Sequence, residues 1–536
     1  MTIRQALDTF WDSVLEVEPL VATEIGDKRF DHLLPDLSPN GRHRRQAAGD
    51  ALTAAVESVR TDDMPTELRL GAALARFIAR RQADRVQHRL DLLEAASHQW
   101  GPGHVLAEIT EIHRVESAAD AATLTARLRA IPDYLRCACD LLTEGAASEI
   151  TATIPVVERS IKQVERILAV GAHDSPLVTG IAAKDLELRT LRDDVAALLA
   201  DQVLPAYQRY RDALIDYRRS AATGFGLCWL PGGDQMYRAA ARAWTSLDLD
   251  PEQVHAEGRE LLAALRAQRG ALGSAPVPPI RAGNEIEQLA RQYVQRAQEA
   301  VPLWFDVDAP PCEVRPIDGY RSAADTSPGY YHPPTDDGAR PGTFHVNTGN
   351  PHVVARLAAV AFHETLPGHH LQHVAERERH RRNPDLPSVR RFGGVFAGSA
   401  ASEGWGLYAE RLADEMGLYH EPWERAGMID AQAWRAVRLV VDTGIHAFGW
   451  DRDRAVRELR MAGLDQGTAD IEADRYAALP GQALAYALGA DRIRRWRDRF
   501  VRETGGDAAV RGFHSRVLEL GALPLEVLES ELFGRP

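Results

Sequence analysis

Apolar residues spaced three or four positions apart dominate this chain and constrain its fold more than any other feature. The spacing is clear in Leu68–Ala79 and extends from the N-terminus to about Ser220. It resumes after Pro351 and continues to the C-terminus. Because a helix places residues three and four apart on the same face, this pattern is typical of amphipathic helices that pack on a core. We therefore predict a mainly α fold, a large body of many helices.

One segment departs from the helical pattern. From Val301 to Asn350 the chain is rich in proline, glycine and aspartate, and Gly342–Thr348 gathers β-branched and aromatic residues that favour strands. We expect a small β-sheet near 301–350. The proline-rich and glycine-rich stretch Gly273–Gly283 is typical of a connector. The predicted organisation is therefore an N-terminal helical lobe at 1–272 and a second lobe at 273–536, with a central cleft.

Two helix features can be predicted in more detail. The stretch Leu186–Arg219 has the pattern of one or two long helices that bend near Pro205, because proline removes a backbone donor and clashes with the preceding turn. Asp250 and Pro251 are suited to the N-cap and first position of a helix that continues to about Gly270.

Charge and composition exclude several classes of protein. The chain has 63 Lys and Arg against 77 Asp and Glu, and a formal net charge of −14 without a dominant basic block, so we expect no nucleic-acid partner. The sequence contains no run of about 18 apolar residues, so we expect no membrane span. The four cysteines form no CxxC pair, and the N-terminus lacks the pattern of an export signal. These observations predict a cytoplasmic protein.

A cluster of histidines stands out in the C-terminal half. Four of the 19 histidines lie between His363 and His373. A solvated helix face that is rich in histidine is one interpretation. However, the apolar run at 353–362 directly precedes His363 and predicts a buried position for it. The alternative is a metal site.

The spacing of these histidines differs from the HExxH zinc motif, in which two histidines four residues apart share a helix face and the glutamate between them activates water. On a regular helix His369 would point about 120° away from His363 and lie roughly 9 Å along the axis. His370 would face correctly but lie roughly 10.5 Å away. Pro367 and Gly368 permit a distorted helix that brings the next histidine back toward His363.

The motif resembles that of the gluzincin zinc peptidases, in which the second histidine often follows a glycine. This resemblance implies Zn²⁺ bound by His363 and His369, with His370 as the alternative second ligand. Gluzincins take a third ligand from a glutamate on a later helix, which implies Glu403 in the segment 400–410. Glu364 would then be the general base, and Glu410 a carboxylate that orients a histidine.

Five segments spread over the chain resemble the bacterial domain-of-unknown-function 885 family. They are Pro19–Asp27, Leu230–Asp234, His363–His370, Glu403–Trp405 and Pro480–Tyr486. The resemblance extends over nearly the whole chain. It implies a gluzincin-like fold and metal chemistry, but no particular substrate.

Residues beyond the ligands could complete the site. Gluzincins commonly use a tyrosine or histidine to donate a hydrogen bond to the oxyanion, and Tyr486 is our first candidate and His446 the second. His446 follows Arg438 and Asp442 at intervals of four residues, which equally suits a structural row of ion pairs. Tyr486 could likewise be an ordinary core residue.

Three residues are weaker candidates for substrate binding. Arg475 could bind a carboxylate with both ends of its guanidinium, or simply hold two helices together. Gln482 lies one turn before Tyr486. His345 lies in the segment at 330–348, where related peptidases place an edge strand that pairs with extended substrate. A proline-rich surface loop is the alternative for this segment.

The main functional hypothesis is a zinc-dependent hydrolase that cleaves peptide or peptide-like amide bonds in small substrates. One alternative is a zinc-dependent hydrolase or lyase that acts on a nonpeptide small molecule in specialised metabolism. Another is a noncatalytic protein that binds a small molecule or peptide. Exopeptidase and oligopeptidase activities are not distinguished by the sequence, and the oligomeric state does not follow from it.

Overall fold

The computed structural model describes residues 2–58, 64–181, 186–280, 283–317, 327–334, 341–350, 354–506 and 508–534. Helices make up most of this part of the chain, and a three-stranded sheet is its only sheet, so the predicted mainly α fold with a small sheet is confirmed. No helix among these residues has the combination of length and apolar character that a bilayer span requires.

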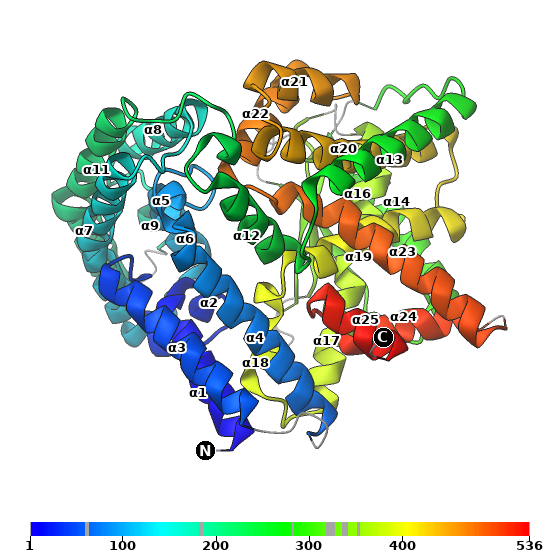
Figure 1. Cartoon of the computed structure of the whole chain (residues 1–536), viewed down its shortest axis with the longest axis horizontal. Coiled ribbons are helices and arrows are strands. Elements are labelled where there is room, and N and C mark those ends of the chain that lie inside the picture. The colour runs from blue at the N-terminus through cyan, green and yellow to red at the C-terminus, as the bar shows by residue number, and fades with distance from the viewer. Residues whose placement is uncertain are drawn as a thin grey trace.

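The helices before the predicted connector occupy the left and lower parts of Figure 1 and extend through α12 and α13 toward the right. Their bounds are α1 Ile3–Val17, α2 Pro19–Glu24, α3 Pro39–Glu57, α4 Thr66–Gln87, α5 Leu90–Glu94, α6 Val105–Ile112, α7 Ala118–Ala147, α8 Ile154–Val170, α9 Pro176–Gly180, α10 Leu186–Leu198, α11 Leu204–Tyr217, α12 Gly233–Thr245 and α13 Pro251–Ala271.

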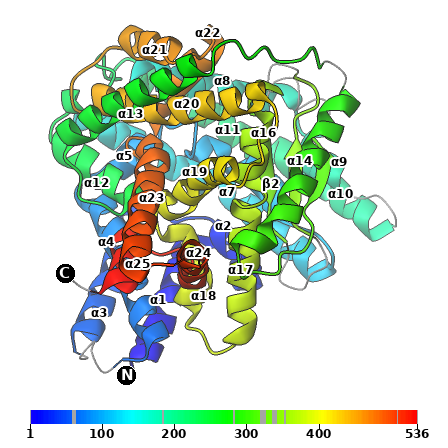
Figure 2. The same cartoon turned by 90° about the vertical axis from the view of Figure 1, so that its right-hand side faces the viewer.

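The later helices include α14 and α16, which contact the sheet, and α16 and α17, which carry the histidine cluster. Their bounds are α14 Gly283–Trp304, α16 Val354–Glu364, α17 His369–Arg382, α18 Ser388–Phe392, α19 Ser399–Glu415, α20 Pro422–His446, α21 Arg452–Met461, α22 Gln466–Ala478, α23 Ala485–Thr504, α24 Ala509–Leu520 and α25 Leu525–Phe533. Helices α16, α19 and α20 lie close together in both views and contact one another (Figures 1 and 2).

The sheet has the strand order β1-β3-β2, where β1 is Glu313–Pro316, β2 is Gly329–His332 and β3 is Thr343–Val346. The central strand β3 coincides with the best strand candidate of the sequence. It pairs with β1 in parallel and with β2 in antiparallel orientation. Within the predicted substrate-edge segment, β2 is therefore an edge strand and β3 is not. Residues 335–340 of that segment lie outside the described residues, as do residues 281–282 of the predicted connector.

The predicted helix start at Asp250 and Pro251 is confirmed, and a change of helical pitch lies next to Pro205, where the sequence predicts a bend. A π-helical turn at Leu199–Val203 separates α10 from α11, and Pro205 lies in the first turn of α11. Proline cannot donate the α-helical hydrogen bond to the previous turn, which explains why the regular helix changes pitch there. Asp250 caps α13, and its side chain accepts a hydrogen bond of 3.1 Å from the backbone N–H of Glu252.

The largest cluster of buried apolar residues joins both ends of the chain. It includes Leu7 and Trp11 of α1 together with Val389 of α18 and Leu528 of α25. A second cluster lies between residues 20 and 221 and fills the space among α5–α11. The largest core thus includes residues from both predicted lobes. The division at residue 272 stays a prediction.

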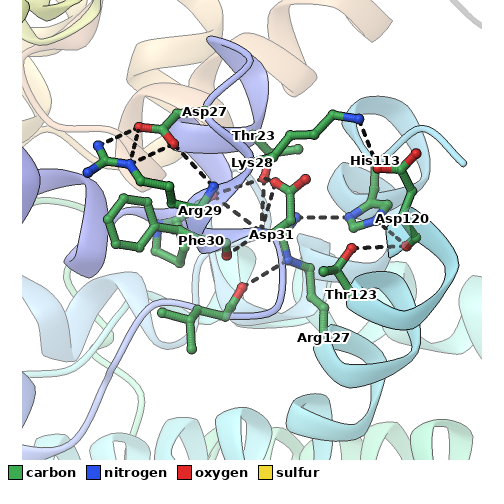
Figure 3. A network of polar contacts seen from close by, with 12 residues as sticks. Thr23, Asp27, Lys28, Arg29, Phe30, Asp31, His113, Asp120, Thr123 and Arg127 are labelled. Atoms are coloured by element: carbon green, nitrogen blue, oxygen red, sulfur yellow. Dashed lines mark hydrogen bonds and ion pairs between the residues drawn. The ribbon is translucent and has the colours of Figure 1, made fainter. Parts of the chain in front are cut away.

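The motif at 19–27 lies beside a fully buried guanidinium, that of Arg127 in α7 (Figure 3). This guanidinium donates to the carbonyl oxygens of Leu33 and Phe30 and to the hydroxyl of Thr23, each at 2.9 Å. It also lies 3.2 Å from Nδ1 of His113. Arg127 therefore ties the segment after α2 to α7, and we call this network the Arg127 clasp.

Candidate metal centre

The chain between the two histidines of the motif leaves the helix altogether. Helix α16 ends at Glu364, residues 365–368 form a turn, and α17 begins at His369. A side chain at Gly368 would collide with the carbonyl oxygen of His363, because its Cβ would lie 1.8 Å from that atom. The sequence predicted a distorted helix at Pro367 and Gly368, and the distortion is a complete break between two helices.

This turn brings His363 and His369 together with Glu403 of α19. The imidazole centroids of the two histidines are 4.8 Å apart. Oε2 of Glu403 lies 3.4 Å from Nε2 of His363 and 3.9 Å from Nε2 of His369. One ligand atom from each residue lies within 4.8 Å of the other two. We call these three residues the His–His–Glu triad.

Two glycines of α19, Gly404 and Gly406, allow close packing against two different helices. Gly406 faces the motif helix, since a Cβ there would lie 2.5 Å from Nε2 of His363. Gly404 instead packs against Gly489 of α23, where a Cβ would lie 2.5 Å from its backbone. Of these two glycines, only Gly406 therefore makes room for the triad. Gly404 instead allows α19 and α23 to approach closely.

Glu410 orients His363 from the side opposite the triad. It is completely buried, and its Oε1 lies 2.9 Å from Nδ1 of His363. Its other oxygen accepts a hydrogen bond of 2.9 Å from Nε2 of Gln432 in α20. Sequence reasoning identified Glu410 but missed Gln432, because nothing in the local pattern of α20 relates it to the motif.

His370 faces away from the triad. Its Nδ1 lies 2.8 Å from the hydroxyl of Tyr331, and its Nε2 lies 2.8 Å from the carbonyl oxygen of Pro310. Both ring nitrogens are therefore engaged elsewhere. Of the two candidates for the second ligand, the structure brings only His369 to Glu403.

The charges of the triad are strongly coupled. Burial lowers the pKa of His363, but the interactions with Glu403 and Glu410 outweigh burial and raise it to about 10. Burial also opposes the charged form of Glu403, yet the two histidines hold its pKa well below the usual range. Burial raises the pKa of Glu364, partly offset by the positive charges of His363 and His369. The interaction with Glu403 also raises the pKa of His369 against the effect of burial, and a metal ion that binds an imidazole nitrogen must displace its proton.

Tyr486, at the start of α23, belongs to a neighbouring polar cluster. Its ring lies under the guanidinium of Arg438, 4.7 Å from the ring centroid. Its hydroxyl forms no hydrogen bond with the described residues, so it is free to donate. Arg475 donates to Oε1 of Gln482 at 2.7 Å and to Glu472 at 3.4 Å. These two weak candidates for substrate binding therefore contact each other.

Arg438, Asp442 and His446 do not form a continuous row. Arg438 pairs with Glu472 at 3.1 Å, while Asp442 accepts hydrogen bonds from the Tyr237 hydroxyl and the backbone N–H of Gly481. In His446, Nδ1 accepts from the backbone N–H of Leu227 and Nε2 lies 3.0 Å from the Tyr476 carbonyl. Burial lowers the pKa of His446 to about 4, so the ring is neutral.

These contacts place Asp442 and His446 in the core. Both side chains are almost completely buried, and together they join α20 to the segments at 227–237 and 476–481. Two of the family-like motifs, Leu230–Asp234 and Pro480–Tyr486, lie in or next to those segments. His345 is on β3, where its ring stacks on that of Tyr330 at 5.0 Å.

Comparisons with known proteins give a family and a fold. A family model described as "Bacterial protein of unknown function (DUF885)" matches residues 19–532. The structure titled as the putative lipoprotein from Colwellia psychrerythraea is similar, with a TM-score of 0.86 and 22% identity over 99% of this chain and 98% of that one. One from Shewanella oneidensis, titled as a putative lipoprotein of unknown function, has a TM-score of 0.73 and 16% identity over 99% of both chains. No curated protein matches.

Proposed function

The chain belongs to the DUF885 family of bacterial proteins of unknown function, and we propose that it is a zinc-dependent hydrolase that cleaves peptide or peptide-like amide bonds in small substrates. The observation that carries this proposal is the convergence of His363, His369 and Glu403 beside the half-buried side chain of Glu364. The resemblance of the motif to gluzincin peptidases supports it. A cytoplasmic location is part of the same proposal.

The donor set fits zinc. Two imidazole nitrogens and one carboxylate oxygen are common zinc ligands that leave a fourth position open, and bonds of 2.0–2.1 Å separate the ligand atoms of a tetrahedral site by about 3.4 Å. In the triad, the oxygen of Glu403 lies 3.4 and 3.9 Å from the two nitrogens. The second position of the triad is therefore assigned to His369 rather than His370.

When bound, zinc would act as a Lewis acid on the scissile carbonyl and lower the pKa of a water molecule. Glu364 would accept the proton of the attacking water and later deliver it to the leaving amine. The free hydroxyl of Tyr486 would donate a hydrogen bond to the oxyanion that develops on the substrate. Glu410 would hold the imidazole of His363 in its orientation.

Metal content tests the ligand set. Elemental analysis of the purified wild type should find close to one zinc per chain, and His363→Ala, His369→Ala and Glu403→Ala should lose it. His370→Ala is the matched control, because both of its ring nitrogens are engaged elsewhere. A folded wild type that takes up no zinc when it is supplied would show that the proposal is wrong.

Turnover tests the second half of the proposal. We expect Glu364→Gln to retain zinc but to lose hydrolysis of a peptide library. If Glu364→Gln cleaved the same peptides at the wild-type rate, the role of the general base would be wrong. Binding of peptides without any cleavage by the zinc-loaded wild type would favour the noncatalytic alternative.

A further inference from the structure

Three arginines surround the indole of Trp434 in α20. The guanidinium carbon of Arg356, on α16, lies 4.6 Å from the centroid of this ring. Those of Arg435 and Arg438, on α20 itself, each lie 5.1 Å from it. Arginine readily stacks on aromatic rings, and such stacking leaves the edge of the guanidinium able to donate hydrogen bonds. We call these residues the Trp434 arginine cluster.

The cluster has more positive than negative charge. Arg438 is paired with Glu472, which also binds Arg475. Within the described part of the chain, no carboxylate forms an ion pair with Arg356 or Arg435. Among the described residues, Arg435 donates one hydrogen bond, to the carbonyl oxygen of Ala431 at a long 3.4 Å. Among the described residues, Arg438 is thus the one arginine of the cluster with a carboxylate partner.

Unused donors in the cluster are shielded from solvent. The side chain of Arg438 is 5% exposed, and its Nη1 is buried without a hydrogen-bond partner. Nε of Arg435 is also buried without a hydrogen-bond partner. Buried donors of a charged group are normally satisfied, because an unpaired one costs free energy. The cluster therefore has guanidinium donors that its one carboxylate partner, Glu472, does not satisfy.

The cluster lies beside the His–His–Glu triad. Arg356 and His363 are seven residues apart on α16, so they lie on one face and about 10.5 Å apart along the axis, the length of about three extended residues. On α20, Arg435 lies one turn after Gln432, whose amide reaches Glu410 behind His363. The positive charge of Arg435 also acts on the carboxyl of Glu364.

We propose that Arg356, Arg435 and Arg438 bind a carboxylate of the substrate and thereby select short acidic peptides, or peptides with a free C-terminus, for the neighbouring triad. This inference rests on the proposed hydrolase function. Planar guanidinium groups match a carboxylate through paired hydrogen bonds, and the buried setting strengthens them. The distance to the triad suits a carboxylate within a few residues of the bond to be cleaved.

Affinity selection with three peptide libraries tests this inference. The peptides have two to five residues and are presented to zinc-loaded Glu364→Gln, so that binding is measured without turnover. The first library has free C-termini, the second is amidated, and the third is amidated but contains aspartate or glutamate. We expect the wild-type cluster to retain the first or third library about tenfold or more over the second. The two sources of the carboxylate are thereby distinguished.

Variants of the cluster should remove this preference. Arg356→Gln and Arg435→Gln, made singly and together in the Glu364→Gln background, should bind the three libraries equally. The matched control is Arg425→Gln, since Arg425 is on the same helix but forms an exposed ion pair with Asp414. Equal retention of all libraries by the intact cluster, no retention of any library, or a preference that survives in the double variant would overturn the inference.

Failure of this inference can be separated from failure of the hydrolase proposal. Zinc content and cleavage by the chain with Glu364 intact depend on the triad, whereas carboxylate preference is measured in the absence of cleavage. Zinc binding and hydrolysis without carboxylate preference would refute only the role of the arginines. Carboxylate preference in a zinc-loaded protein that cleaves no peptide when Glu364 is intact would refute only the hydrolase. Circular dichroism spectra of each variant establish that the fold is retained.

Discussion

Replacement of Glu410 by glutamine should weaken zinc binding without removing any atom that touches the metal. When Nε2 of a histidine binds zinc, Nδ1 carries the proton and donates it to a neighbouring acceptor. Glu410 provides that acceptor at 2.9 Å, and its other oxygen accepts from Gln432 at 2.9 Å. Both oxygens of this buried carboxylate therefore act as acceptors. The anionic charge additionally makes the imidazole a stronger ligand.

The glutamine amide has only one acceptor. If its NH₂ group faces Gln432, two donors meet, and if it faces His363, the ring N–H loses its acceptor. Loss of such an outer partner typically costs 10- to 100-fold in metal affinity, or about 1.4–2.7 kcal/mol. We therefore expect the zinc dissociation constant of Glu410→Gln to rise by about that factor. Competition with a chromophoric chelator measures it directly.

A second substitution provides a rescue. In the double variant Glu410→Gln and Gln432→Glu, residue 432 can accept from the new amide, while the amide oxygen accepts from His363. Part of the lost affinity should return, because the carboxylate at 432 would also face the carbonyl oxygen of Leu407, to which Gln432 donates at 3.0 Å. Glu415→Gln is the control on the same helix, because the side chain of Glu415 is 45% exposed and pairs with Arg497. A dissociation constant for Glu410→Gln within about twofold of the wild type would refute this account of the role of Glu410.

Three further predictions follow from the packing. Gly406→Ala should lose zinc while staying folded, as measured by elemental analysis and circular dichroism, because its Cβ would lie 2.5 Å from Nε2 of His363. Acid should destabilise the protein: burial lowers the pKa of His446 and of His514 to about 4 from an ordinary 6.5. Their stabilising contribution is complete above pH 6.5 and is lost as the pH falls toward 4, by about 1.4 kcal/mol each at pH 5.5, which urea unfolding at several pH values would detect. Arg127→Met should lower the free energy of unfolding by about 3–5 kcal/mol, measured in urea, because several buried acceptors lose their donor.

Each of these predictions has a contrary outcome. Full zinc content in Gly406→Ala would mean that α19 can move away from the histidine. For the histidines, a loss of unfolding free energy between pH 7.5 and 5.5 that is no smaller in His514→Gln than in the wild type would contradict the neutral state of buried His514. For the clasp, Arg136→Met on the same helix is the control, since Arg136 is 60% exposed. Equal loss in both arginine variants would mean that the buried contacts of Arg127 contribute nothing.

Local sequence signals predicted the helices well because the information they require is local. Periodic apolar residues determine which face of a helix is buried, and the cap of α13 depends only on Asp250 and its immediate neighbours. Similarly, the pitch change before α11 follows from the missing donor of Pro205. The strand β3 was recognised from its β-branched and aromatic residues. The strand order β1-β3-β2 was not, since it depends on pairing between distant segments.

The candidate site was predictable in its residue types but not in its geometry. Glycine and proline between the histidines indicated a distortion, yet the path of that turn depends on contacts with other segments. His370 faces away from the triad because its ring nitrogens contact the hydroxyl of Tyr331 and the carbonyl oxygen of Pro310, and neither residue is near it in sequence. For the same reason, no local pattern could relate Gln432 to Glu410. The cluster around Trp434 likewise forms only where α16 and α20 meet.

The core that joins α1 to α18 and α25 has a consequence for synthesis on the ribosome. Leu7 and Trp11 share this core with Leu528, and Arg69 donates a hydrogen bond to Glu531 near the end of the chain. At typical elongation rates, a chain of 536 residues takes roughly half a minute to two minutes to complete. Throughout that time the core that α1 shares with α18 and α25 stays incomplete, although α1 already packs on α3 and α4. We therefore expect nascent chains that lack the last helix to depend on chaperones.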